Sequence, residues 1–201
     1  MIAAIILAAG ASERMGYPKA LLPYRGRSFL EGILEACYAA GVEHRVVVLG
    51  HHADKVLESI DLSGVTVTKS KDLDAGPIGS VWAGLASLAS VPVDAVLVWP
   101  VDRPHIAVTT AESLVDAFRS THQPIVIPTC QGKRGHPVLF GRAVFAELLG
   151  APRDEGARAV VHRDPARVAE VPVEDPAVLE DFNTPDDYKK LLRREDEVRG
   201  D

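Results

Sequence analysis

The sequence has few cysteines and no long hydrophobic run. Cys37 and Cys130 are its two cysteines and stand far apart, which excludes a disulfide framework and a cysteine-based zinc site. No apolar stretch approaches the roughly 20 residues that span a bilayer. No basic segment precedes an apolar one at the N-terminus, as it would in a signal peptide. We therefore expect a reduced cytoplasmic protein with no membrane segment.

Positive charge is also in short supply, because the 201 residues carry a formal net charge of −6. This balance argues against a general nucleic-acid binder, so no nucleic-acid partner is expected. The hydrophobic content of 47% and charged content of 25% are those of an ordinary globular protein. We predict a single domain over residues 1–195 and a frayed tail over residues 196–201. Such a protein must concentrate its cations locally if it binds a polyanion.

The first stretch of the chain, IAAIILAAGASERMGYPK, combines an apolar run with a loop of small residues and two cations. The run Ile5-Ile6-Leu7 predicts a buried strand of a parallel sheet. Small residues after such a strand let a ligand approach the backbone N–H groups, which favour anions. Arg14 and Lys19 follow within nine residues of Gly10. Neither a Walker A loop nor a GxGxxG fingerprint is present, yet the stretch predicts a triphosphate cradle.

The rest of the chain alternates between predicted strands and helices. Ser28 and Glu31 form an expected capping box for a helix that ends at Gly41. The order β-α-β-α-β at the start implies an α/β protein with a parallel sheet. Further strands are expected at residues 45–49, 65–68, 94–99, 124–128 and 168–173. Further helices are expected at about residues 53–60, 108–120, 143–149, 156–162 and 185–195, and one more follows the loop at residue 72 and ends at about residue 89.

The pattern LAAG-x-S-x-R-M-G-x-P-K at residues 7–19 resembles the signature of the MobA-like nucleotidyltransferase family. That family includes the molybdenum cofactor cytidylyltransferases and guanylyltransferases. The resemblance implies a single-domain, Rossmann-like three-layer α/β sandwich with a mostly parallel central sheet, of the nucleotide-diphospho-sugar transferase type. It also implies that the loop backbone holds the base and sugar, while Arg14 and Lys19 neutralise the triphosphate and the leaving pyrophosphate.

A second wall of the nucleotide site is expected in residues 72–85. A helix N-terminus near Gly79 and Ser80 would carry a partial positive charge there, although the glycines could instead only permit tight packing. The Ser-Val-x-x-Gly-Leu portion resembles that of cytidylyltransferases, which implies that Ser80 lies beside the base. Taken together, the loop and this second wall give the expected nucleotide-binding residues, which are Leu7, Ala8, Ala9, Gly10, Arg14, Lys19, Gly79 and Ser80.

A magnesium site is predicted around Asp102. This residue follows the strand 94–99, and ligands of open α/β sheets bind at the carboxyl ends of the strands. Mg²⁺ usually takes one or two carboxylates together with phosphate oxygens and water. The resemblance implies the same role for the Asp-x-Pro at residues 102–104, and a second ligand in Asn183 before Thr-Pro. The alternatives are that Asp102 caps a turn or pairs with Arg103, and that Asn183 only shapes its turn.

An acceptor site is predicted in the basic, glycine-rich segment QGKRGHPVLF. The segment has the composition of a hairpin turn, and a solvated hairpin tip is the alternative interpretation. The run GHPVLF resembles the molybdenum cofactor cytidylyltransferase branch, in which this segment borders the acceptor. Lys133, Arg134 and His136 are therefore expected to contact an acceptor phosphate. A histidine base is not required, because a phosphate monoester is already largely ionised near neutral pH.

These patterns predict a Mg²⁺-dependent nucleotidyltransferase with Arg14, Lys19 and Asp102 as catalytic residues. By resemblance the favoured donor is CTP and the favoured acceptor is molybdopterin or the molybdenum cofactor. A GTP-dependent guanylyltransferase and a sugar-phosphate nucleotidyltransferase are the nearest alternatives. A non-catalytic nucleotide-binding module is a second class, and the missing GxGxxG disfavours a nicotinamide-dependent oxidoreductase. The oligomeric state stays open.

Overall fold

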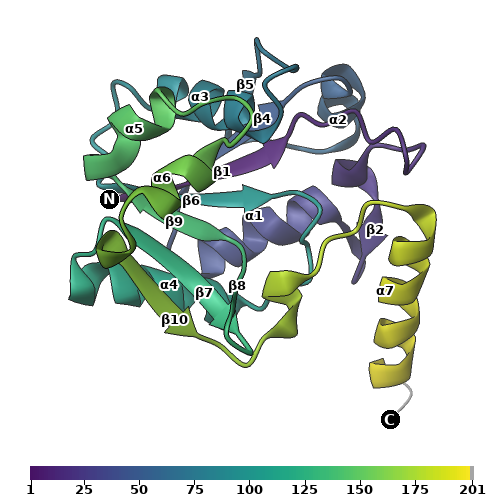
Figure 1. Ribbon diagram of the computed structural model, residues 1–201. Helices are drawn as coiled ribbons and strands as arrows, with labels where there is room; N and C mark the ends of the chain where they lie inside the picture. Colours follow the sequence, from purple (N-terminus) through teal and green to yellow (C-terminus); the bar gives the residue numbers. More distant parts are fainter. Residues whose placement is uncertain (200–201) are drawn as a thin grey trace.

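The computed structural model describes residues 1–199, and the side chains of residues 1–195, as one α/β domain. An eight-stranded sheet runs through its middle in the order β10-β7-β9-β6-β1-β4-β5, with β8 paired to β7 (Figure 1). Its strands are β1 (Ile2–Ala8), β4 (His44–Leu49), β5 (Thr66–Lys69), β6 (Ala95–Pro100), β7 (Ile125–Cys130), β8 (Lys133–Arg134), β9 (Val138–Gly141) and β10 (Val168–Pro172). The pairs β1·β4, β1·β6, β4·β5 and β7·β10 are parallel, whereas β9 is antiparallel to both of its neighbours. The mostly parallel sheet expected from the sequence is confirmed.

Both faces of the sheet are buried, which explains the uninterrupted apolar run at the N-terminus. In β1, Ala4 and Ile6 belong to one hydrophobic cluster, and Ala3 and Ile5 belong to the other. Because successive side chains of a strand point to opposite faces, a strand covered on both sides needs apolar residues at every position.

Helices cover the two faces as separate layers (Figure 1). A two-stranded ribbon, four short 3₁₀ turns and a C-terminal helix complete the described structure. On one face lie α1 (Phe29–Ala39), α2 (Ala53–Ser59) and α4 (Val108–Thr121), and on the other lie α3 (Pro77–Ser87), α5 (Phe145–Leu149) and α6 (Ala157–Arg163). The ribbon is β2 (Pro23–Tyr24) with β3 (Arg27–Ser28), and the turns are η1 (Lys19–Leu21), η2 (Arg142–Val144), η3 (Pro165–Arg167) and η4 (Pro176–Leu179). This arrangement confirms the expected three-layer sandwich.

The ends of three helices test the predictions of their boundaries. The capping box of α1 is present, since the Ser28 side chain accepts from the Glu31 N–H while Glu31 accepts from the Ser28 N–H. Helix α3 begins at Pro77, two residues before the Gly79 near which its start was expected, and proline suits the first position of a helix. The last helix, α7 (Pro185–Arg199), continues beyond the expected end at about residue 195. Residues 200 and 201 of the predicted tail lie outside the described residues.

The order of the strands creates an opening at one edge of the sheet. The chain passes from β1 to β4 and β5 on one side and then returns to β6 on the other side of β1. The loops that leave the carboxyl ends of β1 and β6 therefore diverge, and such switch points are where open α/β sheets bind ligands. Within the described residues, no helix has the length and apolar character that crossing a membrane requires.

Candidate functional site

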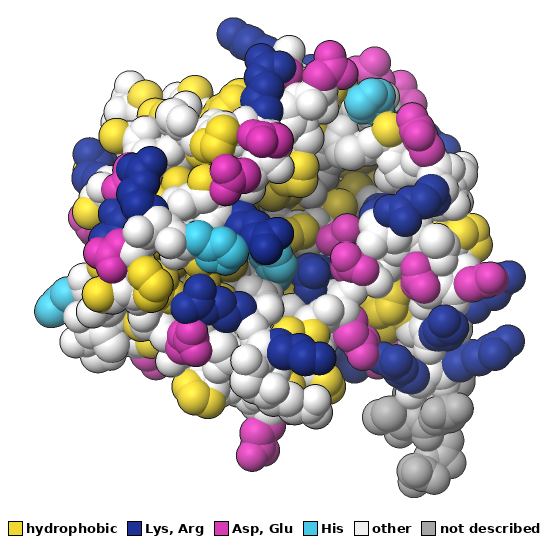
Figure 2. All heavy atoms as spheres, in the orientation of Figure 1, with side chains coloured by type: hydrophobic (Ala, Val, Ile, Leu, Met, Phe, Trp, Pro, Cys, Tyr) yellow, Lys and Arg dark blue, Asp and Glu magenta, His cyan; other side chains and the backbone are white. Residues whose placement is uncertain are grey.

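An open cavity of about 1190 Å³ lies at this switch point. Figure 2 shows a hollow in this face of the molecule, with charged and histidine side chains gathered around it. All the predicted site residues except Gly79 and Lys133 line the cavity. These lining residues are Leu7, Ala8, Ala9, Gly10, Arg14, Lys19, Ser80, Asp102, Arg134, His136 and Asn183.

Gly79 and Lys133 are the two predicted site residues that do not line the cavity. A Cβ added at Gly79 would lie 2.3 Å from the Asp72 carbonyl oxygen, which shows that this glycine lets the loop before α3 cross the helix closely. Lys133 is exposed on β8. The alternative interpretation of the α3 glycines, tight packing, therefore holds for Gly79, while Ser80 lies buried in the wall of the cavity with 4% exposure.

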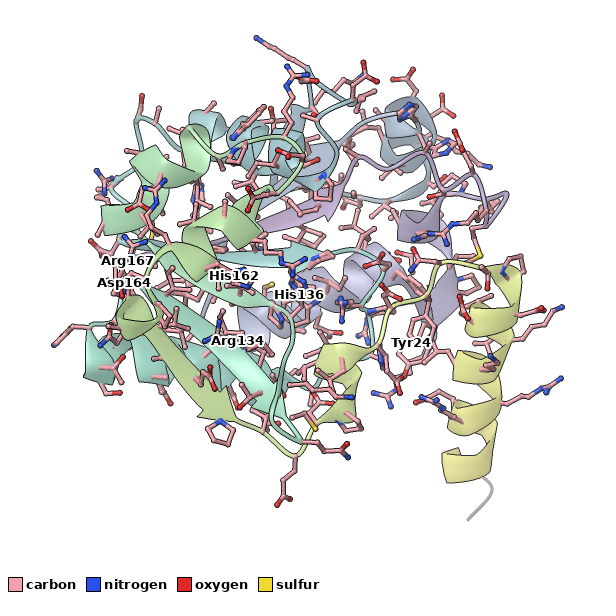
Figure 3. All side chains as sticks on the ribbon, in the orientation of Figure 1. Tyr24, Arg134, His136, His162, Asp164 and Arg167 are labelled. Atoms are coloured by element: carbon pink, nitrogen blue, oxygen red, sulfur yellow. The ribbon has the colours of Figure 1, made fainter. Side chains whose placement is uncertain are left out.

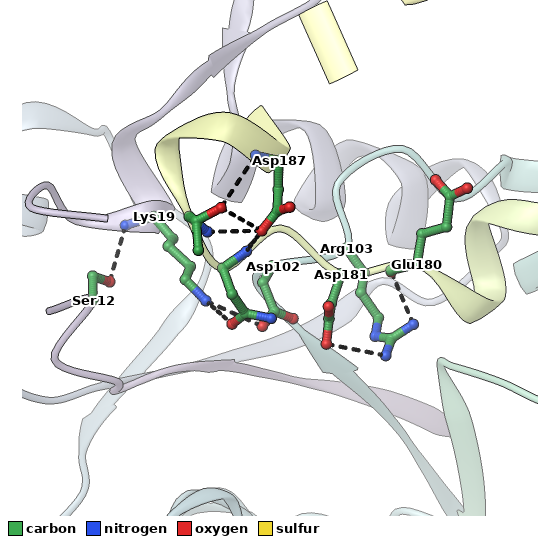
Figure 4. Close-up of polar contacts among 9 residues, drawn as sticks. Ser12, Lys19, Asp102, Arg103, Glu180, Asp181 and Asp187 are labelled. Carbon is green, nitrogen blue, oxygen red and sulfur yellow. Dashed lines mark hydrogen bonds and ion pairs between the residues drawn. The ribbon is translucent and has the colours of Figure 1, made fainter. Parts of the chain in front are cut away.

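Ser12 organises the loop that follows β1. Its backbone has a positive φ of 54°, and its carbonyl oxygen accepts from the N–H groups of Met15 and Gly16 at 3.0 Å each. Its side-chain oxygen accepts from the backbone N–H of Lys19 at 3.2 Å (Figure 4). The loop is thus folded around Ser12, which also fixes the backbone position of Lys19. Sequence reasoning assigned no role to Ser12, and its place in the N-terminal pattern was the only signal.

The end of β4 supports the same loop from the other side. A ring nitrogen of His52, Nε2, lies 2.7 Å from the Ala11 carbonyl oxygen, which can only accept, so Nε2 carries the proton in this contact. The His51 N–H donates to the Ala9 carbonyl oxygen at 3.4 Å. Both histidines line the cavity, and sequence reasoning missed them. Their position directly after a buried strand was the available signal.

Three segments far apart in the sequence meet at the Lys19 ammonium group. Its nitrogen lies 2.6 Å from Asn183 Oδ1 and 3.3 Å from Asp102 Oδ2 (Figure 4). The side chains of Lys19 and Asp102 are only 13% and 22% exposed, so water screens this ion pair weakly. Arg14 also lines the cavity, and its guanidinium makes no hydrogen bond or ion pair within the described part of the chain.

The oxygens of Asp102 and Asn183 are a donor set that fits Mg²⁺. Both are hard oxygen ligands, they converge on one cation, and one of them is a carboxylate. The described residues contain no group of three or more His, Cys, Asp or Glu side chains that could hold a metal ion. A metal held by Asp102 and Asn183 would thus need further oxygens from substrate phosphates and water, as is usual for Mg²⁺.

The hairpin of β7 and β8 forms another wall of the cavity and confirms the expected hairpin. Its turn residues Gln131 and Gly132 both have positive φ, as a two-residue hairpin turn of type I′ requires. Arg134 is paired with Glu170 of β10, with an Nη2 to Oε1 distance of 2.7 Å. Burial is the largest cause that lowers the pKa of His136 to about 4, and the nearby Arg103 charge contributes in the same direction while Asp181 opposes it. His136 is therefore neutral near pH 7.

Helix α6 contributes two further side chains that sequence reasoning did not assign to the site. Arg158 and His162 both line the cavity, and Figure 3 shows where His162 lies on the ribbon relative to Arg134 and His136. The two α6 residues are four positions apart and so share one face of the helix. Only the spacing within a predicted helix could have linked them before the structure was known.

The fold and the site define an α/β nucleotide-binding protein. Its ligand cavity sits at the switch point of a mostly parallel sheet, beneath a small-residue loop that carries two cations. Residues 4–168 match the MobA-like NTP transferase domain, and the chain belongs to this family of nucleotidyltransferases. Members of the family use nucleoside triphosphates and phosphate-bearing acceptors.

Similar proteins align over nearly the whole chain. A nicotine blue oxidoreductase of Paenarthrobacter nicotinovorans is 32% identical over 95% of this chain and 96% of its own length. A molybdenum cofactor guanylyltransferase of Xanthomonas euvesicatoria is 29% identical over 94% of this chain and 93% of its own. The structure of Rv0371c from Mycobacterium tuberculosis H37Rv superposes with a TM-score of 0.81 at 30% identity, covering 96% of this chain and 97% of that one. A second structure of Rv0371c is a complex with manganese. It superposes with a TM-score of 0.76 at 28% identity and covers 96% of this chain and 98% of that one.

Proposed function

We propose that this protein transfers CMP from CTP to a phosphate-bearing acceptor of the molybdopterin type and releases pyrophosphate. The observation that carries the proposal is the convergence of Lys19, Asp102 and Asn183 beside the small-residue loop. The guanylyltransferase among the relatives supports a molybdenum cofactor acceptor and makes GTP the main rival donor. The preference for CTP rests on the LAAG loop, the buried Ser80 and the GHPVLF segment.

The reaction requires the chain to position two phosphate groups and to neutralise their charge. An oxygen of the acceptor phosphate forms a bond to the α-phosphorus, and the bond from that phosphorus to the pyrophosphate oxygen breaks, with the electron pair leaving on pyrophosphate. Arg14 and Lys19 would stabilise the charge that accumulates on the leaving group. The loop of residues 8–10 would hold the nucleotide through its backbone and thereby align it for attack.

Asp102 and Asn183 would hold Mg²⁺, which when bound neutralises phosphate oxygens. Manganese in the Rv0371c complex supports a divalent ion for a related protein. Because the Lys19 ammonium group already satisfies both oxygens, the ion has to compete with it for them. Neutral His136 in the cavity wall offers a ring N–H or a lone pair to the acceptor, but no positive charge.

A pyrophosphate-release assay tests the proposal. CTP, GTP, ATP and UTP are each supplied with Mg²⁺ and with molybdopterin, molybdenum cofactor or a sugar 1-phosphate as acceptor. We expect release only with CTP and a molybdopterin-type acceptor. Release with GTP would make the protein a guanylyltransferase, and release with the sugar phosphate would replace the acceptor. Nucleotide binding without release in every combination would indicate a non-catalytic module.

A nicotinamide assay is the necessary companion, because one relative is named an oxidoreductase. We expect neither NADH nor NADPH to be oxidised, since the loop after β1 lacks the GxGxxG that approaches a dinucleotide pyrophosphate. Steady oxidation of either cofactor would contradict the proposed reaction. The cytoplasmic location expected from the sequence stays a prediction.

A further inference from the structure

We propose that Arg103 is a positioning residue that fixes residues 178–183 across the end of β6 and thereby brings Asn183 to Asp102. The inference rests on the proposed function in one respect, namely that Asp102 and Asn183 together hold a divalent ion. The pattern Asp-x-Pro leaves the middle position open, and the structure gives this arginine a specific task.

The Arg103 side chain bonds to one short segment of the chain. Its Nη1 donates to the carbonyl oxygens of Val178 and Glu180, both at 2.9 Å. Its Nη2 lies 3.8 Å from Asp181 Oδ2 (Figure 4). At the other end, the Arg103 carbonyl oxygen accepts from Trp99 Nε1 at 3.0 Å, and Trp99 is fully buried. Arg103 is therefore anchored in the core and holds the segment from there.

The same segment reaches the site through its backbone. The Phe182 N–H donates to the Asp102 carbonyl oxygen at 3.1 Å, one residue before Asn183. The Val178 carbonyl oxygen also accepts from the His136 N–H at 2.9 Å. The loop that carries one proposed ligand, Asn183, is thus hydrogen-bonded to the backbone of the other, Asp102. Without Arg103, the Glu180 carbonyl oxygen would lose its side-chain partner, whereas that of Val178 would keep the one from His136.

The other side of Asn183 is fixed by the start of α7. Asp187 accepts from the N–H groups of Asn183 and Thr184, at 3.3 and 3.0 Å, and its own N–H donates to the Thr184 hydroxyl at 3.2 Å. This reciprocal cap holds Asn183 from its C-terminal side only. Residues 180–183 are neither helix nor strand, so their position depends on bonds from outside the segment.

Arginine has properties that suit this task and that lysine lacks. The Arg103 side chain is only 12% exposed, and burial lowers its pKa from the ordinary value while Asp102 and Asp181 act in the opposite direction. Arginine remains charged under such burial, and its planar fork serves several acceptors at once. The sequence alternative in which Arg103 serves as the ion-pair partner of Asp102 is not the arrangement found, because Lys19 pairs with Asp102.

Arg142 provides a matched control. It also bonds backbone carbonyl oxygens, with Nε donating to Val93 at 2.7 Å and Nη2 to Val91 at 3.5 Å. It does not line the cavity. Arg142→Met therefore removes a comparable set of bonds at a distance from the site and reports the purely structural cost of such a loss.

The test measures Mn²⁺ affinity by electron paramagnetic resonance, with the triphosphate that the donor assay selects and with no acceptor. We expect Arg103→Met to weaken Mn²⁺ binding about tenfold, the lower range for residues that orient metal ligands. Asn183→Ala should weaken it similarly, and the double variant should be no weaker than the worse single variant, because both changes act through one ligand. Arg142→Met should remain within twofold of wild type, and Arg103→Lys should recover part of the loss.

Three outcomes would overturn the inference, and they are distinguishable. If Asn183→Ala weakens Mn²⁺ binding but folded Arg103→Met does not, the metal assignment stands and the role of Arg103 falls. The role of Arg103 also falls if the two losses add in the double variant. If Asn183→Ala leaves the affinity unchanged, Asn183 is no ligand and both the assignment and the inference fail. Should Arg103→Met not fold, the same cycle run with Arg103→Lys decides the question.

Discussion

Two walls of the cavity differ in how far their charged groups are already paired. One is the loop of residues 7–19, and the other, called the hairpin wall below, is the segment of residues 125–141 that contains the hairpin of β7 and β8. On the loop wall, Lys19 is directed at two oxygens inside the cavity, and Arg14 makes no ion pair within the described residues. On the hairpin wall, Arg134 is already paired with Glu170, and burial keeps His136 neutral near pH 7. In the part of the chain that the structure describes, the loop wall therefore carries one unpaired cation, Arg14, beside Lys19, whose charge Asp102 balances. The basic groups of the hairpin wall that line the cavity are instead paired or neutral.

This difference supports the assignment of one substrate to each wall. A triphosphate brings several negative charges and requires a cation that is not already neutralised, and within the described residues the loop wall supplies one in Arg14. An acceptor with one phosphate brings less negative charge and therefore requires fewer cations. The Arg134 ion pair is partly exposed, with side chains that are 35% and 49% accessible, and such pairs contribute at most about 1 kcal/mol. Arg134 can therefore exchange Glu170 for an acceptor phosphate at small cost.

The largest expected effect separates a lysine of the loop from a lysine of the hairpin. Lys19→Ala should lower turnover by about a hundredfold or more, which is the scale of one lost charge contact in a transition state. Lys133→Ala should leave turnover within about twofold, because Lys133 is exposed and does not line the cavity. Pyrophosphate release at saturating nucleotide measures both. Equal losses in the two variants, or none in Lys19→Ala, would remove the proposed contrast between the walls.

The loop wall could be predicted from the sequence because its residues are contiguous. The strand, the small-residue loop and the two cations all lie within residues 2–19, and local chemistry indicates an anion site. The partners of Lys19 could not be derived from this stretch, since they lie 83 and 164 residues away. The position after the strand 94–99 indicated that Asp102 lies at this end of the sheet, whereas only the resemblance to a family suggested that Asn183 joins it.

The residues that support the site were the hardest to predict. Arg103 acts through carbonyl oxygens more than 70 residues away, and any residue can supply a carbonyl oxygen, so the sequence holds no signal for them. Gly79 and Ser80 are neighbours in the sequence, but only Ser80 lines the cavity. Which of the two lines the cavity depends on where α3 begins, and helix ends are poorly defined by sequence patterns.

A second contrast separates two glycines that border the loop. A Cβ added at Gly50 would lie 2.3 Å from the Ala9 carbonyl oxygen, which is backbone and cannot move away easily. Gly50→Ala should therefore destabilise the protein by about 1–3 kcal/mol, the usual cost of overpacking. A Cβ at Gly10 would meet no protein atom within 4 Å, so Gly10→Ala should leave the unfolding midpoint unchanged.

The two glycine variants also test where the nucleotide lies. If the loop backbone contacts the nucleotide, the methyl group of Gly10→Ala occupies that space, and the variant should bind triphosphate at least tenfold more weakly while remaining stable, since about 1.4 kcal/mol corresponds to a tenfold change in affinity. Thermal unfolding and titration calorimetry with Mg²⁺ and each triphosphate measure the two quantities. Undiminished nucleotide affinity in Gly10→Ala would place the nucleotide elsewhere in the cavity.

The smallest expected effect belongs to the hairpin wall and concerns pH. The pKa of His136 falls from its ordinary value of 6.5 to about 4 in the folded protein, chiefly because burial disfavours the charged ring. Between these two values the unfolded chain binds more protons than the folded one, so the free energy of unfolding decreases as pH falls below about 6.5. A shift of this size corresponds to about 1 kcal/mol between pH 7.5 and pH 5.5.

The variant His136→Gln isolates this contribution. Urea denaturation at the two pH values gives the change in unfolding free energy for wild type and variant, and the variant should lose less stability on acidification by about 1 kcal/mol. Lys133→Ala, on the same hairpin but exposed, should show the wild-type pH dependence. If His136→Gln also keeps it, the ring is not held neutral by burial, and His136 would present positive charge to the acceptor. The hairpin wall would then resemble the loop wall, and the charge-based assignment of one substrate to each wall would lose its basis.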